Sequence, residues 1–176
     1  MPKYRKMLSD INAPYLQSLM CLIETQSKTT LANWCIDYTE NKILEIYEKA
    51  YPNDNRCRNT LAAARKWLAG EVKLPYVKDI ILSQCHMAAR QAVDNPAAQA
   101  AARTCGQVAA TIHAPTHCIG LALYGALALA YDKVGIETDW EEILVVVAKE
   151  CHKMEVALKN VAVKNESNPA KINWKC

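Results

Sequence analysis

The sequence predicts an all-α, single-domain antiparallel helical bundle or array of about seven helices, and three observations support this. Apolar side chains recur at intervals of three and four residues along most of the chain, which is the spacing of one helix face. Helix-favouring residues such as alanine dominate, while only five glycines and no phenylalanine occur. No segment shows the apolar–polar alternation of a half-buried strand.

The length of 176 residues suits one domain with its own apolar core. We expect residues 1–164 to form this helical domain and residues 165–176 to form a polar C-terminal tail. The net charge of +3 is too weak to indicate nucleic-acid binding. The longest apolar run, residues 118–131, is shorter than the roughly 18 residues that suggest a membrane span. With no recognisable signal peptide, we expect a cytoplasmic protein that binds neither nucleic acid nor membrane.

Proline, glycine and capping residues set the boundaries of the helices in the first half of the chain. Pro52 ends the second helix, because a proline ring disfavours helix in the residue before it. Gly70 is a plausible stop for the third helix, and Pro75 begins the fourth. The predicted helices cover residues 13–25, 29–50, from 53 or 54 to 70, and 75–92.

Three further helices are predicted over residues 96–113, 115–134 and 138–161. The second of these is apolar nearly all round, so we expect it to be the central buried helix. The third carries apolar side chains in steps of four and three for barely three heptads. This stripe can pack against its own domain, or it can form a coiled-coil seam in a homodimer.

Eight cysteines occur, and no two of them show the two-residue gap of a zinc ribbon or a redox motif. Several fall on apolar helical stripes, where a thiol acts as a small hydrophobe. A disulfide framework would need an exported chain. We therefore expect reduced cysteines in the core, and the sequence predicts neither a bound metal nor a cofactor.

Histidine and arginine form the best candidate site for a ligand. His113 and His117 are four residues apart, so on one continuous helix they would share a face and could hold a metal ion, but Pro115 lies between them. His86 and Arg90 are also four residues apart and could together bind a carboxylate or phosphate. Each histidine can equally be a hydrogen-bonded part of the core.

A second candidate group lies at the start of the third predicted helix. Asp54 fits a capping role there, while Arg56 and Arg58 fit either a solvated turn or a partner-binding surface. Catalytic signatures are missing, since the chain has neither a phosphate-binding glycine loop nor a Gly-x-Ser-x-Gly elbow. Two cysteines each precede or follow a histidine directly, but adjacent helical residues point about 100° apart and form no dyad.

Five stretches carry specific Trp, Arg, His and Gly positions: residues 31–35, 51–58, 62–71, 86–90 and 106–120. They resemble the immunity-five-like family of immunity proteins, over roughly residues 29–131. The resemblance implies an all-helical, cytoplasmic bacterial or archaeal protein that binds and neutralises a toxin made by its own cell or kin. In that family histidine is common at the position of Gln107, and proline is common at the position of Cys57.

Three hypotheses for the function follow, in order of preference. The first is a non-enzymatic, immunity-type binding protein that neutralises a protein toxin through its surface. The second is a small-ligand or metal-binding protein. The third is an enzyme that uses the same side chains for acid–base chemistry. The second and third hypotheses rest on one set of residues: His86, Arg90, Gln107, His113 and His117.

Overall fold

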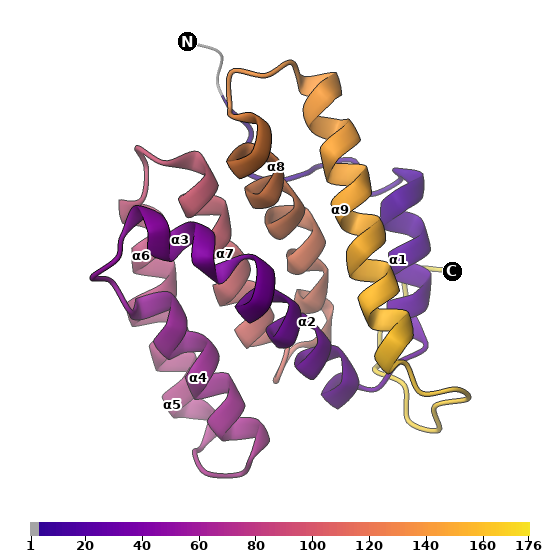
Figure 1. The fold of residues 1–176 in the computed structure, drawn as a ribbon. Helices are drawn as coiled ribbons and strands as arrows, with labels where there is room; N and C mark the ends of the chain where they lie inside the picture. Colours follow the sequence, from indigo (N-terminus) through magenta and orange to yellow (C-terminus); the bar gives the residue numbers. More distant parts are fainter. Residues whose placement is uncertain (1–3) are drawn as a thin grey trace.

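The computed structural model describes residues 4–176, and within this range every regular element is a helix (Figure 1). The all-α class predicted from the sequence is therefore confirmed. In the described range the helical segments group into seven rods. These are α1 (Pro14–Glu24); α2 (Lys28–Lys42) with α3 (Leu44–Ala50); α4 (Arg56–Leu68); α5 (Leu74–Ile80) with the π-helical turn η1 (Ile81–Cys85) and α6 (His86–Gln91); α7 (Pro96–Ala110); the 3-10 turn η2 (Pro115–Ile119) with the π-helical η3 (Leu121–Ala126) and α8 (Leu127–Val134); and α9 (Trp140–Val161).

Local sequence signals fix several of these ends. The Ser27 hydroxyl accepts a hydrogen bond from the Thr30 backbone N–H at 3.2 Å, which caps α2. The Asn95 carboxamide oxygen accepts one from the Ala98 N–H at 3.0 Å, and Pro96 then occupies the first helical position of α7. Gly135 ends α8 with a φ of 81°, a backbone conformation that glycine adopts without a steric penalty.

The predicted helix over residues 29–50 is broken into α2 and α3, which is a correction to the sequence analysis. The break lies at Ile43, whose φ of −118° and ψ of −38° depart from helical geometry. The Ile43 side chain is fully buried and lies against Gly125 of η3, where an added Cβ would come within 2.6 Å of the Ile43 Cδ1. The apolar pattern continues through the break, so periodicity alone could not show it.

The helix at the centre of the bundle is α7, whereas the sequence analysis expected the segment over residues 115–134. Helix α7 packs against α2, α3, α4, α6 and α8. Its inner face consists of small side chains, including Ala98, Ala101 and Cys105, all of them fully buried. Small side chains let neighbouring helices approach closely on several sides, whereas the larger residues of η3 and α8 fill space beside it.

Helix α9 packs against α1 and α8 of its own chain, and Figure 1 shows α9 and α1 side by side. Its stripe residues Val147, Cys151 and Met154 are fully buried. The Trp34 indole N–H of α2 also donates to the Met154 carbonyl at 3.1 Å. Of the two interpretations of this stripe, packing within the domain is therefore the one that the structure shows.

The C-terminal segment folds back onto the end of α1. The backbone N–H of Val163 donates to the Gln26 side-chain oxygen at 2.7 Å, and that of Ala170 donates to the Gln26 carbonyl at 2.8 Å. A disulfide joins Cys21 of α1 to Cys176, with 5.3 Å between their Cα atoms. The expectation of reduced cysteines is wrong for this pair, because the fold of the tail brings together residues 155 positions apart.

The other six cysteines are buried and unpaired in residues 4–176, as the sequence analysis expected for core thiols. Within the same residues, no helix combines the length and the apolar character that crossing a bilayer would require.

Candidate functional site

A cavity of about 200 Å³ opens between the η1 turn, the end of α7 and η2. Three of the chain's four histidines line it: His86 at the start of α6, His113 just after α7, and His117 in η2. Lys78, Ile81, Leu82 and Ala110 complete the wall. The structure thus brings together three histidines that the sequence distributes over 32 positions, from 86 to 117.

Gln107 orients one of these rings. Its side-chain oxygen lies 2.8 Å from the His117 Nδ1. Since a carboxamide oxygen only accepts, Nδ1 carries the proton and the His117 Nε2 is left as the acceptor of the neutral ring. Burial lowers the pKa of His117, and the positive charge that His86 can carry lowers it further. Gln107 therefore acts on the site through His117, although it does not line the cavity.

His113 has a buried Nδ1 atom with no hydrogen-bond partner in the described part of the chain. Its ring centroid lies 6.1 Å from that of His117, with the two planes tilted by 40°. Burial lowers the pKa of His113, and the positive charges of Lys78, His117 and Lys28 add to this effect. A buried polar atom without a partner is destabilising, so this ring is held in place at a cost in stability.

The η1 turn places His86 at the cavity. A π-helical turn takes about one residue more than an α-helical turn, so it rotates the following residues relative to the preceding helix, and such turns are frequent at functional sites. Here it directs the fully buried Cys85 into the core and His86 toward α7. A Cβ at Gly106 of α7 would lie 3.5 Å from the His86 Cε1, so the ring packs directly on this glycine.

Arg90 does not join the histidines. Its side chain is exposed, does not line the cavity, and contacts the Met87 sulfur at 3.7 Å. The predicted pairing of His86 with Arg90 in one site is therefore not seen in the structure. Across residues 4–176, no group of three or more His, Cys, Asp or Glu side chains is arranged to hold a metal ion.

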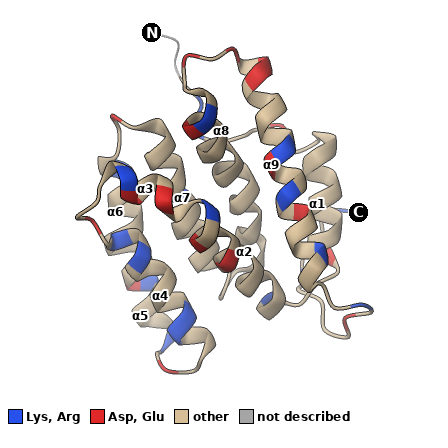
Figure 2. Ribbon diagram, viewed as in Figure 1, with Lys and Arg blue, Asp and Glu red and all other residues tan. Residues whose placement is uncertain are grey.

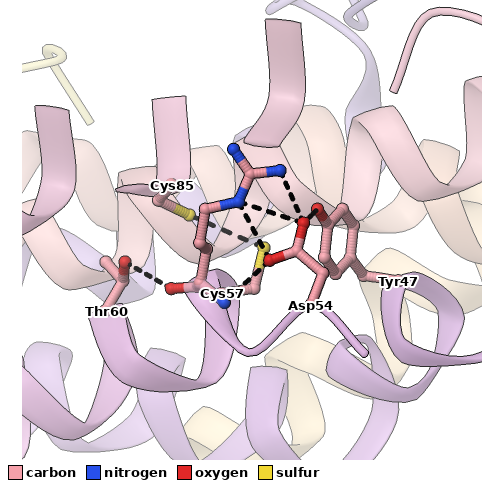
Figure 3. Close-up of polar contacts among 6 residues, drawn as sticks. Tyr47, Asp54, Cys57, Thr60 and Cys85 are labelled. Atoms are coloured by element: carbon pink, nitrogen blue, oxygen red, sulfur yellow. Dashed lines mark hydrogen bonds and ion pairs between the residues drawn. The ribbon is translucent and has the colours of Figure 1, made fainter. Parts of the chain in front are cut away.

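The second candidate group forms an internal network at the corner between α3 and α4 (Figure 3). The Asp54 carboxylate accepts the Arg56 Nε at 2.9 Å and the Arg56 backbone N–H at 3.0 Å. It also accepts the Tyr47 hydroxyl at 2.6 Å. The Arg56 guanidinium is the largest cause that holds the pKa of Asp54 well below its usual range. Asp54 and Arg56 thus hold the α3–α4 turn in shape.

Arg58 lies on the exposed side of α4 and pairs with Glu48 of α3 through two bonds of 2.7 Å. Further along α4, Arg65 pairs with Asp37 and Glu40 of α2. Figure 2 shows basic residues along α4 and acidic residues on α2 and α3. Because opposite charges face one another across these helices, the basic side of α4 is largely neutralised within the chain.

Buried thiols lie behind the histidine cavity. The Cys85 Sγ is 3.9 Å from that of Cys57 (Figure 3). It also lies 3.1 Å from the Ala102 carbonyl oxygen. Hydrogen bonds with Cys105 and Cys85, together with burial, raise the pKa of Cys57. Burial likewise raises the pKa of Cys118, which follows His117. Since Cys85 and Cys118 are fully buried, neither thiol meets a substrate in this conformation.

Sequence reasoning found the three histidines and Gln107, but it missed Lys78, Ile81, Leu82 and Ala110. Lys78 and Leu82 are exposed residues on a helix face of mixed character, which does not by itself mark a cavity. One signal could have indicated these two residues. Both Lys78 and Leu82 share a helix face with His86, at intervals of four residues.

The fold and site define a class of protein: an all-α bundle with a small cavity lined by histidines. The sequence profile of the Imm-5 like putative immunity protein family matches residues 21–157, which include all five stretches that carry the resemblance. The chain belongs to this family. No curated protein and no solved structure matches it.

Proposed function

We propose that this chain is an immunity-type helical binding protein that neutralises a protein toxin by binding it through a surface. The observation that carries the proposal is the family match over residues 21–157, a range from within α1 to within α9 that includes the candidate cavity. As the resemblance implies, we place this binding in a prokaryotic cytoplasm.

The surface that best fits a protein partner is the outer side of the α5–η1–α6 rod. Leu82, Tyr76 and Met87 are 64 %, 48 % and 36 % exposed there. Arg90 contacts Met87 on the same rod. Tyr, Met and Arg are enriched in protein–protein interfaces, and exposed apolar groups lose contact with water when a partner covers them. We call the surface formed by Tyr76, Leu82, Met87 and Arg90 the α5–α6 face.

The residues that the sequence analysis proposed for partner binding are less available to a toxin than the α5–α6 face. Asp54 and Arg56 are hydrogen-bonded to each other, and Asp54 also accepts a hydrogen bond from the Tyr47 hydroxyl. Arg58 is exposed but holds Glu48 through both of its bonds. A toxin at that corner would have to compete with these internal pairs, whereas the apolar groups of the α5–α6 face have no such competitor.

Co-expression tests the proposal. A toxin encoded by the neighbouring gene should inhibit growth, and this chain should restore it. The variant Leu82→Asp should lose the rescue, because it puts a charge at the most exposed apolar position of the α5–α6 face. Val145→Asp is the matched control, since Val145 is 54 % exposed but lies on α9. Circular dichroism should show both variants folded.

Absence of rescue against any neighbouring product would contradict toxin neutralisation. Equal rescue by Leu82→Asp and Val145→Asp would contradict the placement of the toxin on the α5–α6 face.

A second function, small-ligand binding, is favoured by a separate observation. The cavity of about 200 Å³ gathers three imidazoles, and the buried Nδ1 of His113 has no partner in residues 4–176. A bound small molecule would contact the imidazoles that line this cavity. The two functions are compatible, because Leu82 lies both at the cavity and on the α5–α6 face.

A further inference from the structure

The wall of the histidine cavity has an unusual balance of charge. It contains one ammonium group, that of Lys78, and three imidazoles, those of His86, His113 and His117. In the described part of the chain no carboxylate lines it. An ordinary surface site mixes charges of both signs, as α4 and its acidic partners do. Here nitrogen groups converge without a counter-charge.

The electrostatic neighbours of the histidines are positive as well. Lys78 of α5 and Lys28 of α2 act on His113, and His86 of α6 acts on His117. In the unliganded site a proton on either ring would therefore meet repulsion from these groups. A bound anion reverses this relation, because it attracts the proton that the protein alone disfavours.

The bond from His117 to Gln107 prepares the ring for such a ligand. Since Nδ1 donates to Gln107, the His117 Nε2 is the free atom of the ring, and once protonated it is a charged donor. The His113 ring, which also lines the cavity, supplies a second position. Together with Lys78, the cavity is therefore lined by three nitrogen-bearing side chains that can be cationic, and this is the chemistry that binds an oxyanion.

The apolar part of the cavity wall indicates which chemical group the anion has besides its charge. Ile81, Leu82 and Ala110 are apolar, and the volume of about 200 Å³ admits only a small molecule. A fully polar anion such as phosphate would leave these side chains facing it without any favourable contact. A carboxylate on a short aliphatic chain places its charge on the nitrogens and its carbons on the apolar wall.

We propose that the cavity between η1, α7 and η2 binds a small aliphatic carboxylate, held by Lys78, His113 and His117 and packed against Ile81 and Leu82. This proposal rests on the small-ligand function above and names its ligand class. Binding converts the histidines to their protonated form, so the bound carboxylate and the protons stabilise each other.

Histidine side-chain NMR of the full-length chain, titrated with butyrate, tests the proposal. Butyrate should shift the His113 and His117 imidazole signals saturably and raise the pKa of both rings. Butyramide, which has the same carbons and no charge, should bind at least about 10-fold more weakly. Lys78→Gln should weaken butyrate binding about 3- to 10-fold. Arg90→Gln, a cation outside the cavity on the same rod, should leave it unchanged.

The outcomes separate the ligand class from the ligand-binding function itself. Equal binding of butyramide and butyrate would overturn the carboxylate while leaving a small-ligand cavity. Phosphate binding as tightly as butyrate would overturn the aliphatic part. If neither butyrate, butyramide nor phosphate shifts the two imidazoles, both this proposal and the small-ligand function fail. Equal weakening by Lys78→Gln and Arg90→Gln would overturn binding in this cavity.

Discussion

Gly120 lies so close to Gln107 that a Cβ built at position 120 would come within 2.5 Å of the Gln107 Cβ and 2.8 Å of its Cγ. The start of η3 and the helix α7 therefore touch where the absence of a side chain allows it. The same contact holds Gln107 in reach of His117, whose Nδ1 lies 2.8 Å from the Gln107 side-chain oxygen. A glycine outside the cavity thus helps to set the orientation of a ring inside it.

Gly120→Ala should destabilise the fold by about 1–3 kcal/mol, because the new methyl group overpacks a buried contact. The nearest atom is the Gln107 Cβ, which cannot move away without its backbone. Urea unfolding should show a lower midpoint at an unchanged m-value. The His117 imidazole signal should also move in NMR spectra, because Gln107 is displaced.

Gly106→Ala is the matched control for this substitution. Position 106 is also buried on α7, but an added Cβ would meet its nearest neighbour at 3.5 Å, an ordinary van der Waals distance. Alanine is also the better helix former, by about 1 kcal/mol. Equal destabilisation by Gly106→Ala and Gly120→Ala would contradict the close contact at Gln107.

Asp54→Asn should lower the free energy of unfolding by about 1–3 kcal/mol at pH 7, because Arg56 and Tyr47 lose a charged partner. The pKa of Asp54 is held below its unfolded value, chiefly by Arg56. The stabilisation is therefore fully present above the unfolded pKa of about 3.9, and it is lost as the pH falls toward the folded pKa. Urea unfolding at pH 7 and pH 2.5 measures the difference.

The control for this pair is Glu48→Gln, which removes the carboxylate that pairs with Arg58. The Arg58 side chain is 60 % exposed, so solvent screens the pair and we expect a loss of about 0.5 kcal/mol or less. A larger effect for Glu48→Gln than for Asp54→Asn would show that the α3–α4 corner is not held by the Asp54 network.

The sequence predicted the seven rods because the spacing of apolar residues and the capping signals are local. Asn95 with Pro96 starts α7, and Gly135 ends α8. These residues act on their neighbours in the chain, so the helix ends can be inferred from the sequence alone. The break at Ile43 and the π-helical turn η1 were not predicted. Both depend on a partner helix, such as η3 with Gly125 against Ile43, and not on the residues beside them.

The candidate site divides in the same way. His113 and His117 were recognised as a pair from their spacing, and the structure places both in one cavity with His86. Arg90 was paired with His86 on the assumption of a regular helix, yet only His86 lines the cavity. Asp54 was expected to cap the third predicted helix, but the residue at the N-cap of α4 is Asn55, and Asp54 accepts the Arg56 backbone N–H beside it. The bond from Tyr47 of the preceding helix to Asp54 depends on tertiary structure. The spacing of Lys78 and His86 indicates a shared helix face, but that this face lines a cavity depends on the packing of η1 against α7.

The Cys21–Cys176 disulfide should be detectable by counting thiols. Under denaturing, non-reducing conditions, alkylation should modify six cysteines, and after reduction it should modify all eight. Cys176→Ser should lower stability by at most about 5 kcal/mol, since the bond closes a loop of 155 residues. Eight reactive thiols before reduction would contradict the bond. A disulfide is typical of oxidising compartments, so alkylation inside cells also tests the predicted cytoplasmic location.

The unliganded protein should lose stability between pH 8 and pH 5, in part through the histidine cavity. Burial is the first cause that lowers the pKa of both His113 and His117, and nearby positive groups add to it. A lowered folded pKa means that the unfolded chain takes up protons more readily. The free energy of unfolding is therefore highest above the unfolded pKa of about 6.5 and falls as the pH drops below it.

Urea unfolding of the wild type and of His113→Gln at pH 8, 7, 6 and 5 measures how steeply the free energy of unfolding falls with pH. The free energy of unfolding of the variant should depend less steeply on pH, because it keeps only one of the two imidazoles whose pKa is lowered by burial. His152→Gln, on the exposed side of α9, controls for the loss of an imidazole elsewhere in the chain. A slope in His113→Gln as steep as in the wild type would show that this ring does not resist protonation in the cavity.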